Sequence, residues 1–138
     1  EIDDQVIPSS NSVMANNLFD IYKVTYDKYF LNICNKMLSA VALNAKRSPS
    51  NFTNWMLLSK KLNIPKKQYV MVGFSVQELL EFYYEKEFFE DVYLLEKQSD
   101  LSIFKEKYNP NKKNIFICND KFCLPAVLTT KQALNLEI

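Results

Sequence analysis

The sequence has 138 residues, of which 48% are hydrophobic and 14% aromatic, and its formal net charge at pH 7 is +1. This composition can bury a sizeable core in one compact domain or in two small subdomains, which excludes a disordered chain. The near-neutral charge argues against a dedicated nucleic-acid binder, and no apolar run approaches the roughly 18 residues that a membrane-spanning helix needs.

Two residue types are absent or nearly absent, and their scarcity excludes several kinds of active site. The chain has no histidine, which removes Ser-His and Cys-His nucleophile pairs and histidine-ligated zinc. Its single glycine, Gly73, is too few for the phosphate-binding loops of the Walker and Rossmann types. We therefore expect no catalytic residue, no metal and no cofactor in this stretch of chain.

The N-terminal stretch EIDDQVIPSS is polar and acidic and does not begin with Met. It has no signal-peptide pattern, and we expect a piece cut from a longer protein or a processed form. Cys34, Cys118 and Cys123 are too few for a disulfide scaffold. This cysteine usage favours a cytoplasmic location.

The first 65 residues have the periodicity of helices. Pro8 and the polar residues 9–12 precede the first helix and can cap it. The second helix is expected from about Asp27 to just before Ser48, because Pro49 disfavours the helical conformation in the residue before it. Apolar residues recur through these two helices at helical steps, namely Met14, Leu18, Ile21 and Tyr22 on one face of the first, and Phe30, Ile33, Cys34, Met37, Leu38, Val41 and Ala45 in the second.

A third, shorter helix is expected to begin at Ser50 or Asn51 and to end at Ile64. Its expected apolar residues are Trp55, Met56, Leu58 and Leu62. Short links between consecutive helices predict antiparallel neighbours.

The pattern changes at about residue 66. The continuous apolar run 68–73 predicts a strand buried on both faces. A helix over 76–88, capped by Ser75, and a strand over 91–95 complete a βαβ unit with parallel strands. Beyond it we expect a short helix over 101–108, a strand over 114–118, an antiparallel return over 121–124 and a final helix over 129–136. The predicted fold is α/β: a helical segment, 1–65, then a subdomain, 66–138, with a mixed sheet of three or four strands and flanking helices.

Cys118 and Cys123 flank the turn in ICNDKFCLP. Thioredoxin-type redox pairs have the spacing CxxC at a helix N-terminus, and a structural zinc site needs four ligands, so both are disfavoured here. Two structural alternatives remain. The cysteines are packed thiols, the commoner state of buried cysteine, or they form a disulfide across a hairpin.

The candidate ligand-binding residues are Ser9, Ser10, Asn11 and Ser12. Hydroxyl and amide groups at a helix N-terminus can line a pocket for a polar ligand. A helix cap is the simpler alternative, and the two roles are compatible.

Gly73 marks a tight turn at the end of a strand. Acidic residues from Glu78 to Glu96 read as a solvated face, with docking of another domain as the alternative.

Three stretches, in this order, resemble one family. Residues 4–12, with Asn17 and Leu18 following, resemble a signature that runs from Asp to Pro-Ser-Gly-Asn-Ser. Residues 69–73 resemble its strand ending in glycine, and 114–125 resemble its closing element with Cys-x4-Cys-x-Pro. The family comprises thioredoxin-domain-containing proteins, bacterial relatives of the spermatogenesis-associated thioredoxin-like protein. Each has a thioredoxin-like domain followed by a six-hairpin (α/α) toroid similar to N-acylglucosamine 2-epimerases. Ser10 and Ala126 stand where the family commonly has glycine and proline.

The resemblance spans nearly the whole chain but only the C-terminal end of such proteins. It implies that residues 1–65 end the toroid, that 66–138 form an appendage, and that the rest of the parent chain is the main partner. It implies a non-catalytic fragment that supports a toroid pocket for a sugar-like ligand. One alternative is part of an epimerase- or isomerase-like enzyme whose catalytic residues lie upstream. Another is an interaction module that docks the thioredoxin-like domain through its acidic face.

Overall fold

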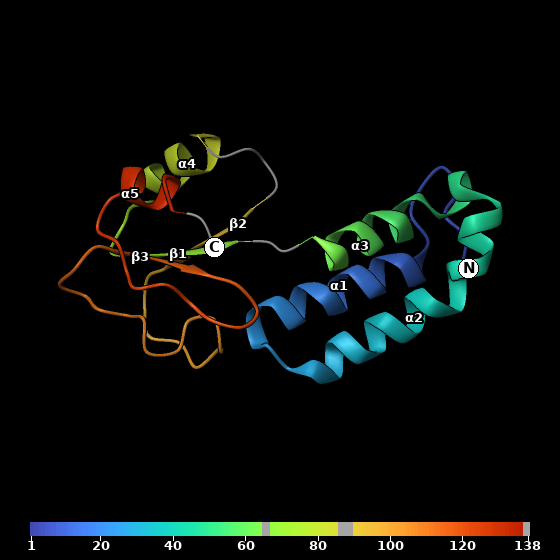
Figure 1. Ribbon diagram of the computed structural model, residues 1–138, viewed down its shortest axis with the longest axis horizontal. Helices are drawn as coiled ribbons and strands as arrows, with labels where there is room; N and C mark the ends of the chain where they lie inside the picture. Colours follow the sequence, from blue (N-terminus) through green and yellow to red (C-terminus); the bar gives the residue numbers. More distant parts are fainter. Residues whose placement is uncertain (65–66, 86–89, 137–138) are drawn as a thin grey trace. The chain divides into compact units, whose positions relative to one another are not determined.

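The computed structural model describes residues 1–64, 67–85 and 90–136 (Figure 1). The chain divides into two compact units, Glu1–Pro65 and Lys66–Ile138, which we call the helical unit and the α/β unit. No helix in the described ranges is long and apolar enough to span a membrane.

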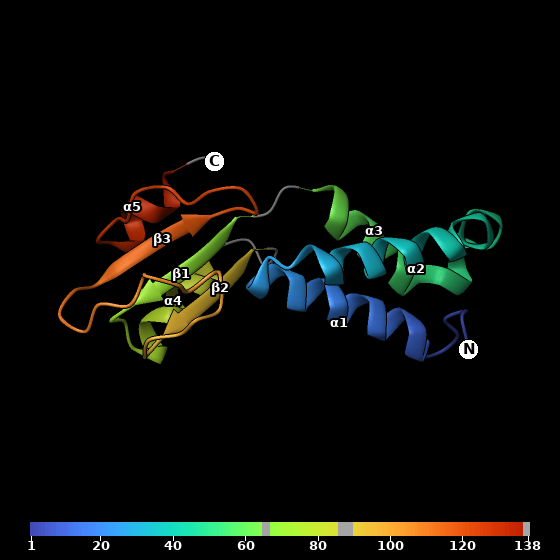
Figure 2. The ribbon, with the colours of Figure 1, turned by 90° about the horizontal axis from the view of Figure 1, so that it is seen from below.

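The helical unit contains α1, α2 and α3 with one turn of 3-10 helix, η1, between the last two. Their bounds are α1 Ser10–Thr25, α2 Lys28–Arg47, η1 Pro49–Phe52 and α3 Thr53–Asn63. The side chains of Ser9 and Asp27 cap α1 and α2, as their positions predict. The short link between α1 and α2 turns the chain back on itself, and the two helices run antiparallel (Figure 2).

The core of the helical unit forms where the three helices meet. Its buried residues are Ala15, Phe19, Cys34, Val41, Phe52, Trp55 and Leu58. On α1, Leu18 and Tyr22 pack against this cluster, but Met14 and Ile21 are 54% and 39% exposed. The four predicted residues share one side of α1, but that side is not the buried one. The core side is centred on Ala15 and Phe19, so Met14 and Ile21 lie outside it.

The start of α3 also differs from the prediction. The helix begins after η1, and neither Ser50 nor Asn51 caps it, because the residue at the cap position is Phe52. Trp55 and Leu58 are buried as expected, whereas Met56 is exposed.

The α/β unit is built around one central strand. Its elements are β1 Gln68–Val72, α4 Val76–Glu85, β2 Asp91–Leu95, β3 Asn114–Cys118 and α5 Thr130–Leu134. Within the described residues the sheet has three strands in the order β2-β1-β3, with β1 parallel to β2 and antiparallel to β3 (Figure 2). Every residue of β1 is buried, which confirms a strand covered on both faces.

The two faces of the sheet have different covers. Tyr69 and Met71 pack with Phe82 of α4 and Ala133 of α5, and α4 and α5 lie on the same side of the sheet (Figure 1). On the other face the segment between β2 and β3 supplies the buried Ile103 and a ring contact between Phe104 and Tyr93.

Two expected elements of the α/β unit are absent from the described residues. Residues 102–107 form successive turns and not a helix, and the left-handed Glu106, with φ of 61°, ends them before Tyr108. Residues 121–124 form no fourth strand and contribute only an isolated bridge between Cys123 and Cys118. The predicted end of α4, residues 86–88, lies outside the described residues.

Gly73, which follows β1, stands at a position that requires glycine. Its φ is +77°, a conformation that side chains rarely adopt. A Cβ at this position would also lie 2.8 Å from the backbone oxygen of Lys112. Glycine is therefore needed both for the turn into α4 and for the close approach of the segment before β3.

Candidate functional site

A buried carboxylate organises the N-terminal end of the helical unit. Asp4 is 4% exposed, and its Oδ1 accepts hydrogen bonds from the backbone N–H of Ser9 at 2.9 Å and the hydroxyl of Ser12 at 2.6 Å. Its Oδ2 accepts the backbone N–H of Asn54 at 2.8 Å. One carboxylate thus caps α1 and α3 together, where helices present unpaired N–H groups and the positive ends of their dipoles.

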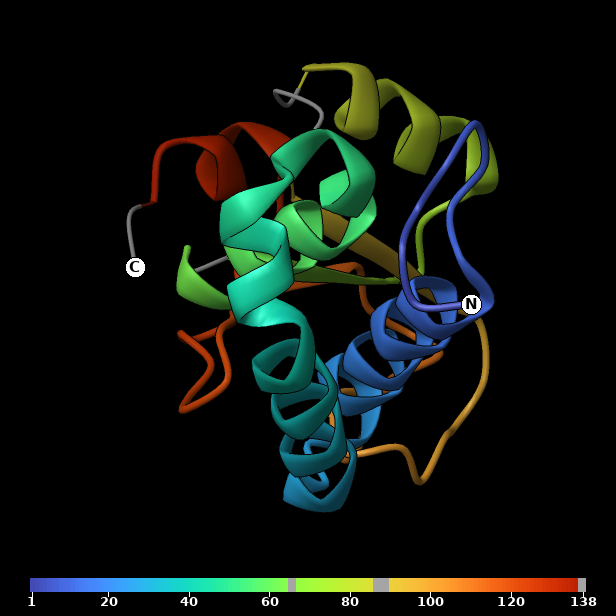
Figure 3. The same ribbon diagram turned by 90° about the vertical axis from the view of Figure 1, so that its right-hand side faces the viewer.

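Further hydrogen bonds hold the N-terminal segment, which leads as a loop into α1 (Figure 3). The backbone N–H of Asp4 donates to the carbonyl of Asn51 at 2.7 Å. The carbonyl of Ile2 accepts both the indole N–H of Trp55 at 2.8 Å and the hydroxyl of Ser9 at 3.1 Å. We call Asp4, Ser9, Ser12 and Asn54 the Asp4 hub.

The hub keeps Asp4 ionised. Burial raises the pKa of this carboxyl, but the hydrogen bonds from Ser12, Ser9 and Asn54 outweigh it and leave the pKa below its ordinary value of 3.8. The negative charge is therefore stabilised at neutral pH by oriented donors at two helix starts.

The hub uses two of the four candidate ligand-binding residues. Ser9 and Ser12 are buried, and their hydroxyls are engaged with one another's backbone, with Ile2 and with Asp4. The cap role of Ser9 is confirmed, because its Oγ accepts the N–H of Ser12 at 3.2 Å. Ser10 and Asn11 are exposed, and the Asn11 amide donates to the carbonyl of Glu1 at 2.6 Å.

A hollow of about 430 Å³ lies beside the hub, at the carboxyl end of α2. The residues that line it include the charged Asp3 and Arg47, the amide residues Asn44 and Asn51, and the buried Phe52. A carboxylate, a guanidinium and two amides can together donate to and accept from the hydroxyl groups of a small polar ligand.

A second polar arrangement lies in the α/β unit at the start of α4. Ser75 and Glu78 cap the helix reciprocally: the N–H of Ser75 donates to the Glu78 carboxylate at 2.9 Å and the N–H of Glu78 donates to Ser75 Oγ at 3.2 Å. Lys113 forms a salt bridge with Glu78 at 2.7 Å. Hydrogen bonds from Lys113 and then Ser75 lower the pKa of Glu78 to about 2.

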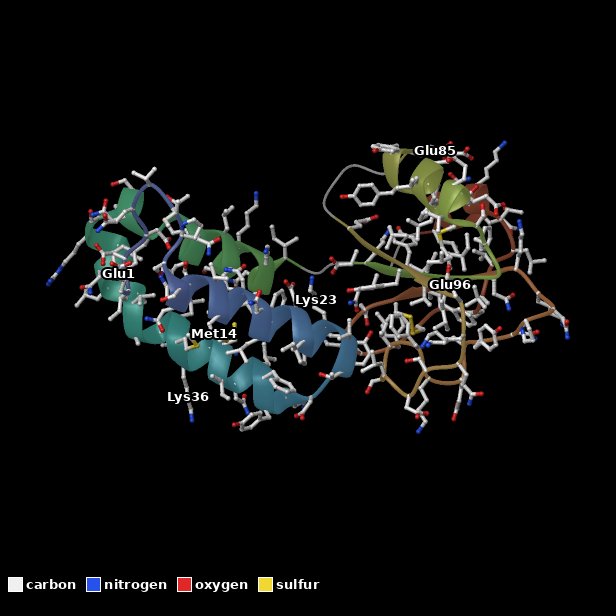
Figure 4. The ribbon with its side chains drawn as sticks, turned by 180° about the vertical axis from the view of Figure 1, so that it is seen from behind. Glu1, Met14, Lys23, Lys36, Glu85 and Glu96 are labelled. Atoms are coloured by element: carbon white, nitrogen blue, oxygen red, sulfur yellow. A yellow bond between two sulfur atoms is a disulfide. The ribbon has the colours of Figure 1, made fainter. Side chains whose placement is uncertain are left out.

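The two predicted structural cysteines are joined. Cys118 and Cys123 form a disulfide, visible in the α/β unit in Figure 4, and Cys34 remains a buried free thiol in the helical unit. Of the two alternatives left by the sequence, the structure has the disulfide.

Comparisons of the chain with protein-family models, curated proteins and solved structures gave no match. The family resemblance therefore stays a prediction.

The sequence analysis did not predict that Asp4 accepts these hydrogen bonds, or that the backbone N–H of Asn54 donates one of them. The serines after Pro8 were found from their cap pattern, but a carboxylate five residues before the cap has no rule of its own. Its bond with the backbone N–H of Asn54, 50 residues away, has no local signal either.

Proposed function

We propose that this chain is a non-catalytic part of a larger protein, in which the helical unit completes a helical toroid and supports its pocket. The observation that carries this proposal is that α1 is apolar on two opposite sides. Ala15 and Phe19 belong to the core, while Val13, Met14 and Ile21 are exposed. Exposed apolar side chains that recur along one side of a helix fit a surface that packs against a neighbouring element.

Other parts of the helical unit support the same proposal. Large apolar side chains are exposed on α3 and in the N-terminal segment, namely Met56, Leu57, Ile2, Val6 and Ile7. Large exposed apolar side chains on a common surface suit a contact with another part of a protein. In the proposal it packs against the remainder of a parent chain, with its toroid and thioredoxin-like domain, in the cytoplasm.

The proposed pocket lies at the Asp4 hub. Ser10 and Asn11 are exposed there, and the hollow lined by Asp3 and Arg47 offers groups that suit a sugar-like ligand. The hub's part is to fix the N-terminal segment, so that the residues around it present their polar groups in one arrangement.

The packing part of the proposal is tested by binding in trans to the upstream helical part of the parent, produced separately. The double variant Met14→Lys/Ile21→Lys places two charges on the outer side of α1 and should weaken binding at least about tenfold, since burying unpaired charge is costly. The control, Tyr29→Lys/Leu43→Lys, changes two exposed apolar residues of α2 and should bind as the wild type does. Equal loss in both variants, or no binding by the wild type, contradicts the proposal.

The pocket part is tested by titrating the parent with a panel of sugars and following amide shifts by NMR. Asn11→Ala and Arg47→Ala should each weaken the binding of a sugar that shifts these residues. If the parent binds a sugar and both variants bind it unchanged, this pocket role is wrong. A coupled epimerisation assay on the same parent tests the alternative of a sugar-processing enzyme.

The docking alternative has less support. Glu78, the first residue of the acidic face, is already engaged by Lys113 and Ser75, and Glu81 accepts a hydrogen bond from Gln77 at 3.0 Å. Glu87 lies outside the described residues. Binding of a thioredoxin-like domain that weakens with added salt would favour this alternative.

A further inference from the structure

The disulfide lies in a hairpin that is also closed by hydrogen bonds. The N–H of Asn119 donates to the carbonyl of Phe122 at 2.9 Å, and the N–H of Leu124 donates to the carbonyl of Ile117 at 2.8 Å. The side chain of Asn119 accepts the N–H groups of Lys121 and Phe122 at 2.8 and 2.9 Å. The turn therefore has backbone and side-chain support that does not depend on the sulfur–sulfur bond.

The two sulfur-bearing residues differ in their access to solvent. Cys118 is the last residue of β3, is 0% exposed and lies opposite Gln68 of the central strand. Cys123, on the other side of the turn, is exposed. Thiol–disulfide exchange needs the attacking thiolate to reach a sulfur atom. The difference in exposure therefore favours attack on the sulfur of Cys123 over that of Cys118.

We infer that Cys123 is a site of reversible thiol–disulfide exchange with an external dithiol, and that Cys118 is its buried partner. A thiolate of the dithiol attacks Cys123 Sγ, the bond to Cys118 breaks, and Cys118 leaves as a thiolate that takes up a proton. The second thiol of the reductant then attacks the mixed disulfide and releases Cys123. Overall the dithiol is oxidised by two electrons to a disulfide and its two protons pass to the two cysteines.

This site differs from a catalytic redox pair. The cysteines are separated by four residues and lie at a strand end and a turn, without the helix N-terminus that lowers the pKa of a CxxC thiol. The hairpin is therefore a substrate of exchange and not a catalyst of it. Reduction removes the covalent link across the turn while the hydrogen bonds at Asn119 and Leu124 keep the strand end in place. The inference is independent of the proposed packing of the helical unit.

The first test is a labelling experiment on the folded chain. The chain is treated with dithiothreitol, pulsed briefly with iodoacetamide under native conditions, quenched and mapped by peptide mass spectrometry. Cys123 should be modified at least about tenfold faster than Cys118, because reactivity follows exposure. Cys34, buried in the helical unit, should be modified only after unfolding. Circular dichroism should be unchanged by reduction.

Four results would overturn the inference. The disulfide could resist dithiothreitol until denaturant is added, reduction could unfold the α/β unit, or Cys118 could be modified as fast as Cys123. Failure of the reduced chain to regain the bond with oxidised glutathione would equally overturn it.

A matched pair of variants separates the two sulfurs. With oxidised glutathione, Cys118→Ala should form a mixed disulfide at Cys123 readily, whereas Cys123→Ala should leave Cys118 at least about tenfold slower to react. Alanine keeps the buried position apolar, and Cys118→Ser provides a second variant if the first does not fold. Equal rates in folded Cys118 and Cys123 variants would contradict the assigned direction of attack.

Discussion

The two units of this chain are held together in different ways. The helical unit ties two of its helices through a buried, ionised carboxylate and leaves many large apolar side chains exposed. The α/β unit surrounds a fully buried strand and secures its turns with local devices: one glycine, reciprocal helix caps and a disulfide. The helical unit thus has a small core with one long-range polar centre, whereas the α/β unit has a covered core with several short-range constraints.

Under the proposed packing, the helical unit is the one that a neighbouring surface would stabilise more. Burial of apolar surface is the main stabilising contribution to a fold, and the helical unit leaves much of it unused. Substitutions confined to one unit, with the other unit as an internal control, test this difference.

The largest effect is expected from Asp4→Ala. The substitution leaves the N–H groups of Ser9 and Asn54 without their acceptor, while the hydroxyl of Ser12 keeps the carbonyl of Ser9, so the loss should be about 3 kcal/mol of unfolding free energy. Chemical denaturation followed by circular dichroism measures the loss of helix, and the tryptophan fluorescence of Trp55 reports on the helical unit. Asp4→Asn keeps the shape and part of the acceptor set, so it should lose less. Equal stability of the alanine variant and the wild type would show that the hub is not an anchor.

Acid should have the same effect by a different route. The pKa of Asp4 is lower in the folded chain than its ordinary value of 3.8, so protonation favours the unfolded state. This contribution to stability is fully present above the unfolded pKa and is lost as the pH falls through the folded pKa. The wild type should therefore lose stability below about pH 4 more steeply than Asp4→Asn does.

A smaller effect is expected in the α/β unit from Gly73→Ala. The new side chain must adopt a φ of +77° and lies against the backbone oxygen of Lys112, so we expect a loss of about 1–3 kcal/mol. Gly73→Asn separates the two causes, because asparagine tolerates the left-handed conformation but brings the same Cβ. Similar losses in both variants would assign the cost to the close contact. Thermal unfolding should show the change in the α/β unit and leave the fluorescence of Trp55 unchanged.

Local signals predicted much of both units. Asp27 and Pro49 delimit α2, and the apolar runs at 91–95 and 114–118 match β2 and β3 residue for residue. These elements are encoded within a few neighbouring residues, by a cap, a proline or a short apolar run.

The remainder depended on contacts that are distant in sequence. Asp4 caps α3 through Asn54, which no local pattern indicates. Residues 101–108 had the composition of a helix, but packing of Ile103 and the ring contact of Phe104 with Tyr93 fix them as turns over the sheet. The outward position of Met14 and Ile21 could not be chosen from periodicity, because α1 offers apolar residues on both sides. The candidate site was found only in part for the same reason.

The smallest effect is expected at Glu78, and it contrasts directly with Asp4. Both carboxylates cap helices, but Glu78 lies at the surface, where its partner is the exposed Lys113. NMR titration should give Glu78 a pKa of about 2, and Lys113→Ala should raise it towards 4.5, whereas Lys112→Ala, one residue away, should change it little. Because the folded pKa of Glu78 is the lower one, the stabilisation is present above pH 4.5 and is lost as the pH falls towards about 2.

Molar salt should screen the Lys113 contribution and raise the pKa of Glu78, while Asp4, held by buried neutral donors, should keep its lowered pKa. If salt affects both carboxylates equally, then the distinction between a buried hub and a surface cap is wrong.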